Sequence, residues 1–381
     1  MLRWIKLRLL DLVLRLTCDL EVLMKKLKLA ILGYGNSGRA YGKMLTEKNS
    51  EIIEKYNTEV IVTAIATKTK GTLIDENGID LVKIEAELSE FGKFQGSAGN
   101  VSSNDSASTS KLSALSTLSA IDVAKTADYD VLIELTPLEI FSGQPAIDHI
   151  KAAFSRGKHV ITANKGPIAW AFSELKDMAT QNNCWFFYET TVMDGTPVFN
   201  LANYTLNMCK ITEVCGILNT TTNFILEELA KGTPYDAIME EGKKRGFVEA
   251  DPSLDIEGWD AAAKVTALMN VLMDANITPI DIDRKGIEDI TAEHIKEAKA
   301  RGKLIKLLCG GKLENGQAKG YVRPEEVELD SVFASITGTS SVVSITTDLM
   351  GTISVIEHDP EIEQTAYGIF GDTLRVLEAV R

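Results

Sequence analysis

A short apolar segment that runs directly into a glycine-rich turn places the tightest constraint on this chain. Residues 28–32 (KLAIL) precede the G-x-G-x-x-G pattern of residues 33–38 (GYGNSG), and a helix-like segment follows. In this pattern the glycines allow a tight turn, close approach of backbone to a pyrophosphate, and packing of the helix on the strand. The helix N-terminus then directs its N–H groups at the phosphates. We expect a dinucleotide to contact seven residues here: Gly33, Tyr34, Gly35, Asn36, Ser37, Gly38 and Arg39.

Length, charge and cysteine content limit the remaining possibilities. The chain has 381 residues, more than the roughly 250 to 300 at which single cores stop growing, so we expect two domains. The formal charge is −14 and the body of the chain has no basic block, which argues against a nucleic-acid partner. Five cysteines are scattered without a C-x-x-C pair. This pattern is typical of reduced thiols in the cytoplasm, and not of a disulfide framework or a zinc site.

Residues 1–27 form an N-terminal extension that we set apart from the fold. The segment is apolar, but charges such as Arg3, Lys6 and Asp11 interrupt it, so no run reaches the roughly 18 residues of a membrane span. Two interpretations stay open. One is a basic amphipathic helix on a membrane surface, and the other is a disordered or wrongly annotated stretch ahead of a start at Met24. We favour the second and expect no membrane partner.

Apolar segments alternate with helix-like segments along the first part of the chain. We expect strands at residues 28–32, 59–66, 129–136 and 158–163, helices at 39–48 and 145–156, and a polar surface loop at 96–119. This alternation predicts an α/β fold with a Rossmann-type, doubly wound parallel sheet over residues 28–165. Ligands of such sheets lie at the carboxyl ends of the strands. Thr136, Pro137 and Lys165 follow two of these strands, so we expect them at the cofactor edge.

The end of the second predicted strand bears on the choice of cofactor. An NAD site normally carries an acidic residue there, which binds the ribose 2′-hydroxyl. This chain has Ala66, Thr67 and Lys68 instead, with Arg39 and Lys70 also available to neutralise a 2′-phosphate. We therefore expect NADP(H) to be preferred over NAD(H). The alternative is that these residues are solvated surface cations.

After residue 185 the pattern changes to Thr-rich strands and long helices, which predicts a second, α+β domain for the substrate over residues 166–340. Within it, Asp260 and Lys264 are four residues apart and hence neighbours on one helix face. The surrounding helix at 261–273 is apolar, so we expect the pair to be partly buried and its pKa values to be perturbed. An ordinary surface ion pair is the alternative.

Five motifs occur here in an order that resembles the homoserine dehydrogenase family. They are GYGNSGR (33–39), VITANKGP (160–167), E-x-x-V (189–192) before Gly195-Thr196-Pro197, GILNTTTNFIL (216–226) and GFVEADPSLDIEGWDAAAK (246–264). The similarity spans Lys28 to the C-terminus. It implies interconversion of L-homoserine and L-aspartate 4-semialdehyde with a nicotinamide cofactor, in threonine, methionine and isoleucine biosynthesis. It also implies a homodimer that pairs through the sheet of the second domain.

The resemblance also implies roles for individual residues. Lys165, Lys264 and Asp260 would act on the reacting hydroxyl, and Thr221, Glu249 and Asp255 would bind the amino acid end. Glu189 and Val192 would lie near a structural Na⁺ or K⁺, held through backbone carbonyls. Hydride removal from an alcohol must be coupled to loss of its proton, so we expect a lysine whose pKa is lowered by the second lysine.

Two departures from the family pattern keep rival interpretations open. Thr220 stands where the family has glycine, and the acidic loop at 357–363 replaces a glycine-rich loop beside the nicotinamide pocket. One rival is a catalytically inactive NADP-binding sensor or scaffold, which this acidic loop favours. The other is a different two-domain semialdehyde oxidoreductase, such as aspartate semialdehyde dehydrogenase. That enzyme needs a nucleophilic cysteine, and Thr220 stands where the thiol would be.

The C-terminal segment, residues 341–381, is expected to return to the nucleotide domain. Residues 331–351 have the pattern of strands that make this return, and the last helix is expected after Asp372. Family members with a C-terminal regulatory domain are much longer, so we expect no such domain.

Overall fold

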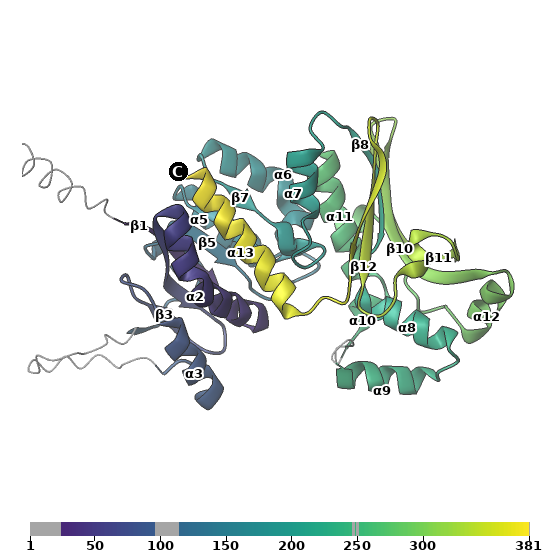
Figure 1. The fold of residues 1–381 in the computed structure, drawn as a ribbon, viewed down its shortest axis with the longest axis horizontal. Coiled ribbons are helices and arrows are strands. Elements are labelled where there is room, and N and C mark those ends of the chain that lie inside the picture. Colours follow the sequence, from purple (N-terminus) through teal and green to yellow (C-terminus); the bar gives the residue numbers. More distant parts are fainter. Residues whose placement is uncertain (1–23, 96–113, 246–247, 249–250, 381) are drawn as a thin grey trace, which may run out of the picture.

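The computed structural model describes residues 24–95, 114–245, 248 and 251–380, and shows two sheet-based units side by side (Figure 1). The first unit holds a seven-stranded sheet in the order β4-β3-β2-β1-β5-β6-β7. The central strands are parallel, and two short strands pair antiparallel at one edge. The strands are β1 (Lys25–Leu32), β2 (Thr58–Ala66), β3 (Thr72–Ile74), β4 (Ala114–Ser116), β5 (Val131–Glu134), β6 (His159–Thr162) and β7 (Phe186–Phe187).

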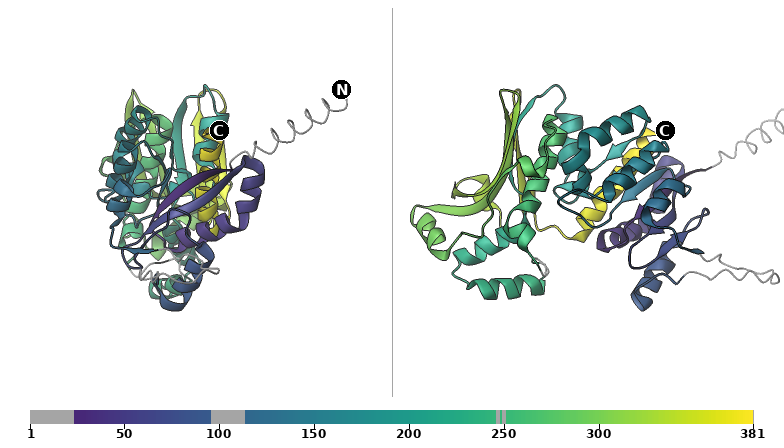
Figure 2. Two further views of the ribbon diagram at one scale, coloured as in Figure 1. Left: turned by 90° about the vertical axis from the view of Figure 1, so that its left-hand side faces the viewer. Right: turned by 180° about the vertical axis from the view of Figure 1, so that it is seen from behind.

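Helices cover both faces of this sheet (Figure 2). Successive residues of a strand point to opposite faces, and both faces are apolar here because both are covered. On β1, for example, Leu29 and Ile31 join one core and Ala30 and Leu32 join the other. The first core is covered by α2 (Asn36–Tyr56), α3 (Leu81–Phe91) and α13 (Ile362–Ala379), and the second by α4 (Ala120–Thr126), α5 (Ala146–Ser155) and α6 (Lys165–Gln181).

The predicted doubly wound α/β fold is confirmed, with two local differences. The sheet continues past residue 165, since β7 pairs with β6. Part of the predicted loop at 96–119 is ordered: β4 at 114–116 pairs with β3, and Ser119 caps α4. Residues 96–113, and most of the N-terminal extension, lie outside the described residues.

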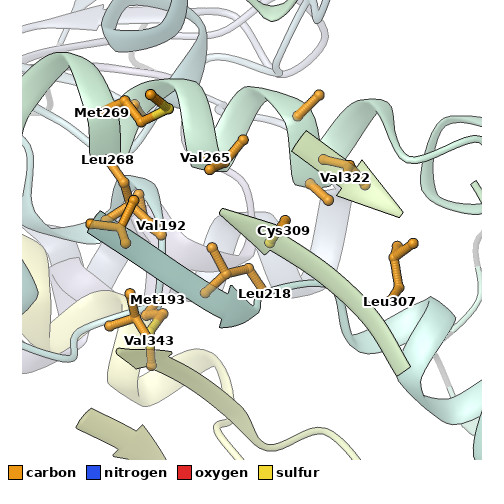
Figure 3. Close-up of a cluster of buried hydrophobic side chains, with 14 of the residues drawn as sticks. Val192, Met193, Leu218, Val265, Leu268, Met269, Leu307, Cys309, Val322 and Val343 are labelled. Carbon is orange, nitrogen blue, oxygen red and sulfur yellow. The ribbon is translucent and has the colours of Figure 1, made fainter. Parts of the chain in front are cut away.

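The second unit is a six-stranded sheet in the order β13-β12-β8-β10-β11-β9, with helices packed on one face. Its strands are β8 (Ile211–Ile217), β9 (Asp283–Arg284), β10 (Lys303–Glu314), β11 (Gln317–Glu328), β12 (Ser341–Thr347) and β13 (Gly351–Glu357). Its helices are α7 (Val198–Thr205), α8 (Thr220–Ala230), α9 (Tyr235–Arg245), α10 (Ser253–Ile256), α11 (Trp259–Met273) and α12 (Ala292–Ala300). Figure 3 shows the core, in which α11 places Val265, Leu268 and Met269 over the strands.

The C-terminal segment returns to the first unit by a route other than the predicted one. The prediction that strands within residues 331–351 lie in the nucleotide domain is wrong, because β12 pairs with β8 and β13 in the second sheet. The β-branched runs indicated strands correctly but carried no information on their partners. The return is made by α13, which begins at Ile362 rather than after Asp372 and packs against α2.

No helix within residues 24–95, 114–245 and 251–380 is long and apolar enough to cross a membrane.

Candidate active site

The glycine turn between β1 and α2 has the geometry that a dinucleotide cradle requires. Gly33 has a positive φ of 91°, and a Cβ there would overlap the carbonyl oxygen of Leu135. Gly35 faces open space, with nothing within 4 Å of an added Cβ. Gly38 packs against Gly33 and Tyr34, which brings the helix close to the strand. The turn therefore leaves room for a pyrophosphate at Gly35, beside the exposed Asn36 and half-buried Ser37 at the start of α2.

Other residues assigned to the cofactor take different positions around this turn. The Tyr34 side chain is 2% exposed and packs against Phe94, so only its backbone faces the turn. Lys70 donates to the carbonyl oxygen of Tyr34 at 2.5 Å. Arg39 is paired with Glu85 of α3, a residue that the sequence gave no reason to select. Lys68 is exposed beyond the end of β2.

The loops after β5 and β6 connect the glycine turn to the second unit. The added Cβ at Gly33 would also lie 2.9 Å from the amide nitrogen of Thr136. The Thr136 hydroxyl donates to the buried Glu134, and its carbonyl oxygen accepts from the Asn164 side chain at 3.0 Å. Asn164 in turn caps α6, whose first residue is Lys165. Thr136 and Lys165 thus lie at the carboxyl ends of neighbouring strands, and Pro137 is exposed beside them.

Lys165, Lys264 and Asp260 meet at one point between the two units. The Lys165 Nζ lies 3.2 Å from one carboxylate oxygen of Asp260, and the Lys264 Nζ lies 3.2 Å from the other. Lys264 also donates to the carbonyl oxygen of Leu218 at 2.6 Å. The three side chains are 17–19% exposed, so the cluster is largely buried, with a small part of each side chain reaching solvent. α6 of the first unit and α11 of the second supply it.

The charges of this cluster determine its protonation. Burial raises the pKa of the Asp260 carboxyl, but the charges of Lys264 and Lys165 outweigh burial and hold the pKa below its ordinary value. Burial lowers the pKa of Lys264, but the carboxylates of Asp260 and Asp194 outweigh burial and raise the pKa above its ordinary value. The prediction of a lysine with a lowered pKa is therefore wrong for Lys264, because carboxylates outnumber the second lysine around it.

Asn219 connects this cluster to the residues assigned to the amino acid end. It caps α8, and its side-chain nitrogen donates to Asp260 at 3.0 Å and to Asp255 at 2.6 Å. The Thr221 hydroxyl donates to the other oxygen of Asp255 at 3.0 Å. Burial, followed by the charge of Asp260, raises the pKa of Asp255. Sequence reasoning missed Asn219, although its place before a helix is the signature of a cap. Glu249 lies outside the described residues.

A cavity of about 590 Å³ lies where α13, β13 and the loop at 195–197 meet. Glu357 and Glu363 of the acidic loop line this cavity together with Met44 of α2. Burial and the nearby Asp194 raise the pKa of Glu357 to about 7. Asp194 also raises the pKa of Lys264, so it joins the groups of the cluster that sequence reasoning missed.

Glu189 and Val192, which were expected near a monovalent cation, lie in and directly after a single buried turn. The Glu189 carboxylate accepts backbone N–H groups of Phe199 and Asn200 at 2.7 and 2.8 Å. Its own N–H donates to Asp372 at 3.0 Å. Among the described residues, three buried oxygens around this turn have no hydrogen-bond partner: Thr190 Oγ1, Asn200 Oδ1 and Asp372 Oδ1. Such oxygens fit a hard cation.

Comparisons with known proteins cover almost the whole chain. The family model for homoserine dehydrogenase matches residues 197–374, and the model for the homoserine dehydrogenase NAD binding domain matches residues 33–189. The chain is 35% identical to a homoserine dehydrogenase of Methanocaldococcus jannaschii, over 92% of this chain and 98% of the relative. It is 32% identical to an NAD(+)-dependent homoserine dehydrogenase of Pseudomonas canavaninivorans, over 93% and 97%.

Solved structures agree with these sequence matches. A putative homoserine dehydrogenase from Archaeoglobus fulgidus superposes with a TM-score of 0.78 at 32% identity, covering 92% of this chain and 99% of that one. A hyperthermophilic archaeal homoserine dehydrogenase in complex with NADPH gives 0.74 at 26% identity, covering 92% and 97%. The chain therefore belongs to the homoserine dehydrogenase family, oxidoreductases that interconvert L-homoserine and L-aspartate 4-semialdehyde with NAD(P).

Proposed function

We propose that Lys165 and Lys264 transfer the hydroxyl proton in this reaction while Asp260 holds them in place. The observation that carries the proposal is that both ammonium groups lie 3.2 Å from the oxygens of one carboxylate. Two lysines fixed in this way place both ammonium groups in one small region around Asp260. A substrate oxygen bound there would lie within hydrogen-bond reach of a proton donor or acceptor.

The two lysines have different surroundings, which suggests a division of roles. Lys264 is held in its charged form by Asp260 and Asp194, so it suits proton donation to the aldehyde oxygen during reduction. In the opposite direction, the neutral amine of Lys264 would take the hydroxyl proton as the hydride leaves, while the second ammonium group stabilises the negative charge that develops on the alcohol oxygen. A nicotinamide cofactor held at the glycine turn would supply or accept the hydride. Thr221 and Asp255 offer a hydroxyl and a carboxylate to the substrate's charged amino acid end, and Glu249 is proposed beside them on the family pattern.

The residues of the glycine turn fit a dinucleotide, because a Cβ at Gly35 would fill open space where a pyrophosphate would lie. Gly33, Gly35 and Gly38 would let the backbone approach it, with Asn36 and Ser37 at the helix start. We propose NADP(H) as the preferred cofactor. Lys70 beside the turn and the exposed Lys68 support this preference, because they provide positive charge for a 2′-phosphate, and Arg39 would add to it once a phosphate displaces Glu85.

Three further features of the protein are proposals of the same kind. A Na⁺ or K⁺ at the Glu189 turn is supported by the unpartnered oxygens there, and a higher unfolding temperature in KCl or NaCl than in choline chloride would test it.

A homodimer is supported by exposed Leu349 and Met350 beside the edge strand β13, and gel filtration tests it. Threonine, methionine and isoleucine biosynthesis in the cytoplasm is the proposed context. Growth of a homoserine auxotroph carrying this chain tests the pathway, and fractionation of the native cell tests the location.

The experiment that tests the proton-transfer roles compares two lysines of the same protein. We expect Lys264→Met to lower kcat for homoserine oxidation by about 10²- to 10⁴-fold, because general acid–base help is lost, while cofactor binding is retained. Lys176→Met is the matched control, since Lys176 is exposed, pairs with Asp274 at the surface and lies over the Phe172 ring. Cofactor reduction is followed by absorbance and cofactor binding by fluorescence. Cofactor binding without any turnover in the parent protein would instead support the sensor or scaffold interpretation.

A further inference from the structure

The Arg39 guanidinium, which borders the glycine turn, is occupied by a carboxylate of the same chain. Its Nε donates to both Glu85 oxygens, at 3.1 and 2.9 Å, and its Nη2 donates to Glu85 as well. Nη2 also approaches the Ser89 hydroxyl at 3.5 Å. This two-pronged arrangement is the one with which arginine binds a phosphate. Glu85 therefore occupies the donors that a phosphate would use.

The position of this ion pair bears on cofactor recognition. Arg39 lies in the first turn of α2, where its N–H donates to the carbonyl oxygen of Gly35 at 2.9 Å. Lys70 comes from the connection after β2 and reaches Tyr34 in the turn. Burial and the charge of Arg39 lower the pKa of Lys70. The Gly33 N–H donates to the carbonyl oxygen of Ala66 at 2.8 Å, so the turn that Lys70 contacts and Arg39 follows lies at the end of β2. This is where folds of this class recognise the ribose 2′ position.

Glu85 brings a negative charge to a place where the sequence motif has none. Residues 66–68 at the end of β2 are Ala, Thr and Lys, without the acidic residue that usually contacts a ribose 2′-hydroxyl. Glu85 arrives instead from α3, across the face of the sheet on which α2 also packs. The hydrogen bonds from Arg39 lower the pKa of the Glu85 carboxyl, so the carboxyl is ionised at neutral pH.

We propose that Glu85 sets the choice between the two nicotinamide cofactors. Its carboxylate competes with a 2′-phosphate for Arg39 and repels the phosphate, so it restrains NADP(H) binding and leaves NAD(H) binding nearly unchanged. This inference rests on the proposed function, because it requires the dinucleotide to lie on residues 33–39. The Arg39 and Glu85 side chains are 34% and 43% exposed, so water weakens their attraction. A dianionic phosphate can therefore displace Glu85, but at a cost in affinity.

The test is a set of binding titrations with cofactor fragments, so it does not depend on turnover. The probes are adenosine 2′,5′-bisphosphate and adenosine 5′-monophosphate, followed by calorimetry, together with NADPH and NADH, followed by fluorescence. We expect Glu85→Gln to tighten binding of the 2′-phosphorylated probes about five- to tenfold, the size of a weak ion-pair effect plus relief of repulsion. Binding of adenosine 5′-monophosphate and of NADH, which lack the 2′-phosphate, should not change. Glu90→Gln removes the same charge from an exposed position on the same helix and should change neither.

A second pair of variants separates competition for Arg39 from general repulsion. In an Arg39→Gln background the affinity for the 2′-phosphorylated probes should fall, and adding Glu85→Gln should then recover little of it. Equal weakening of NADH and NADPH by Glu85→Gln would overturn the inference, because Glu85 would then only position Arg39 against the adenosine. If Glu85→Gln left the ratio of NADPH to NADH affinity unchanged, the inference would also be overturned. Failure of the parent protein to bind either dinucleotide would contradict the proposed cofactor site itself.

Discussion

Two groups of paired charges lie in this molecule, and they differ in how much water reaches them. In the cluster between the units, Asp260 is shared by Lys165 and Lys264, and all three side chains are less than a fifth exposed. At the rim of the glycine turn, Arg39 and Glu85 pair with at least a third of each side chain exposed. The ionic chemistry is similar in the two groups. The first group excludes more water, so its charges are screened less from one another.

This difference explains why the two groups suit different tasks. Buried charges hold fixed positions and stabilise charge that develops during a reaction, whereas partly hydrated charges exchange partners at small cost. The inner cluster therefore suits proton transfer, where geometry must not change. The rim pair suits selection between ligands, where one carboxylate must give way to a phosphate. Each of the following predictions tests this contrast.

The largest of these effects is expected from Asp260→Asn, which removes the carboxylate that pairs with both buried ammonium groups. We expect kcat to fall about 10²- to 10³-fold, because both lysines lose their positions. We also expect the free energy of unfolding to fall by about 3 kcal/mol at pH 7, as when one partner of a buried ion pair is removed. Urea unfolding followed by circular dichroism measures the second quantity. A loss below about 1 kcal/mol would place the cluster in the same class as an exposed pair.

The pH dependence of that difference has a defined sign. The folded pKa of Asp260 lies below its ordinary value of 3.8, so its stabilisation is present above that pH and is lost as the pH falls through the folded pKa. The folded pKa of Lys264 lies above 10.5, so its share is present below that pH and is lost as the pH rises through the folded pKa. The stability difference between the parent and Asp260→Asn should therefore be largest near neutrality and shrink toward both extremes. A difference that does not vary with pH would contradict this account.

An intermediate effect is expected at Gly35, beside the rim pair. Because a Cβ there meets open space, Gly35→Val should fold normally but weaken binding of both dinucleotides at least about tenfold, or 1.4 kcal/mol, by filling the phosphate site. Gly33→Ala is the contrasting variant, since Gly33 has a positive φ and touches Leu135. It should lower the unfolding temperature, which Gly35→Val should not. Normal cofactor binding by Gly35→Val would place the pyrophosphate elsewhere.

The smallest effect is expected from salt. Raising the ionic strength from about 0.05 to 0.5 M shortens the screening length to a few ångströms, which weakens the rim pair far more than the inner cluster. The ratio of NADPH to NADH affinity should therefore change by about two- to threefold between these conditions, while kcat at saturating substrate stays nearly constant. Fluorescence titrations and steady-state rates measure the two quantities. A larger change in kcat than in the affinity ratio would reverse the proposed contrast.

Sequence reasoning succeeded where the information is local. The glycine turn is one continuous segment, so its spacing alone predicts both the strand–turn–helix unit and the fold that contains it. The Asp260–Lys264 pair is also local, because helical geometry makes residues four apart neighbours. That Lys165 joins this pair was known only through the family resemblance. The structure shows directly that Lys165 contacts Asp260. Lys165 is placed there because it is the first residue of α6, which follows the end of β6.

Sequence reasoning failed where the result depends on tertiary neighbours. The direction of the Lys264 pKa shift depends on Asp194, which comes from a different segment. The strands β12 and β13 were expected in the wrong sheet because a β-branched run does not encode its partner strand. Glu85 carries no motif and stands 46 residues from Arg39, so only the packing of α3 near α2 reveals it.

The chain passes between the two units twice, once near residue 195 and again before α13, and the two passages touch. A Cβ at Gly195 would overlap the carbonyl oxygen of Gln364 and lie 3.0 Å from the amide nitrogen of Gly368. Two backbone segments in such close contact move together, because neither can shift without displacing the other. We therefore expect this contact, together with the packing of α6 on α11, to hold the two units in place, so that Lys165 and Lys264 keep their shared partner Asp260. A radius of gyration that stays constant on cofactor binding, measured by X-ray scattering, would agree with this expectation, and one that shrinks would contradict it.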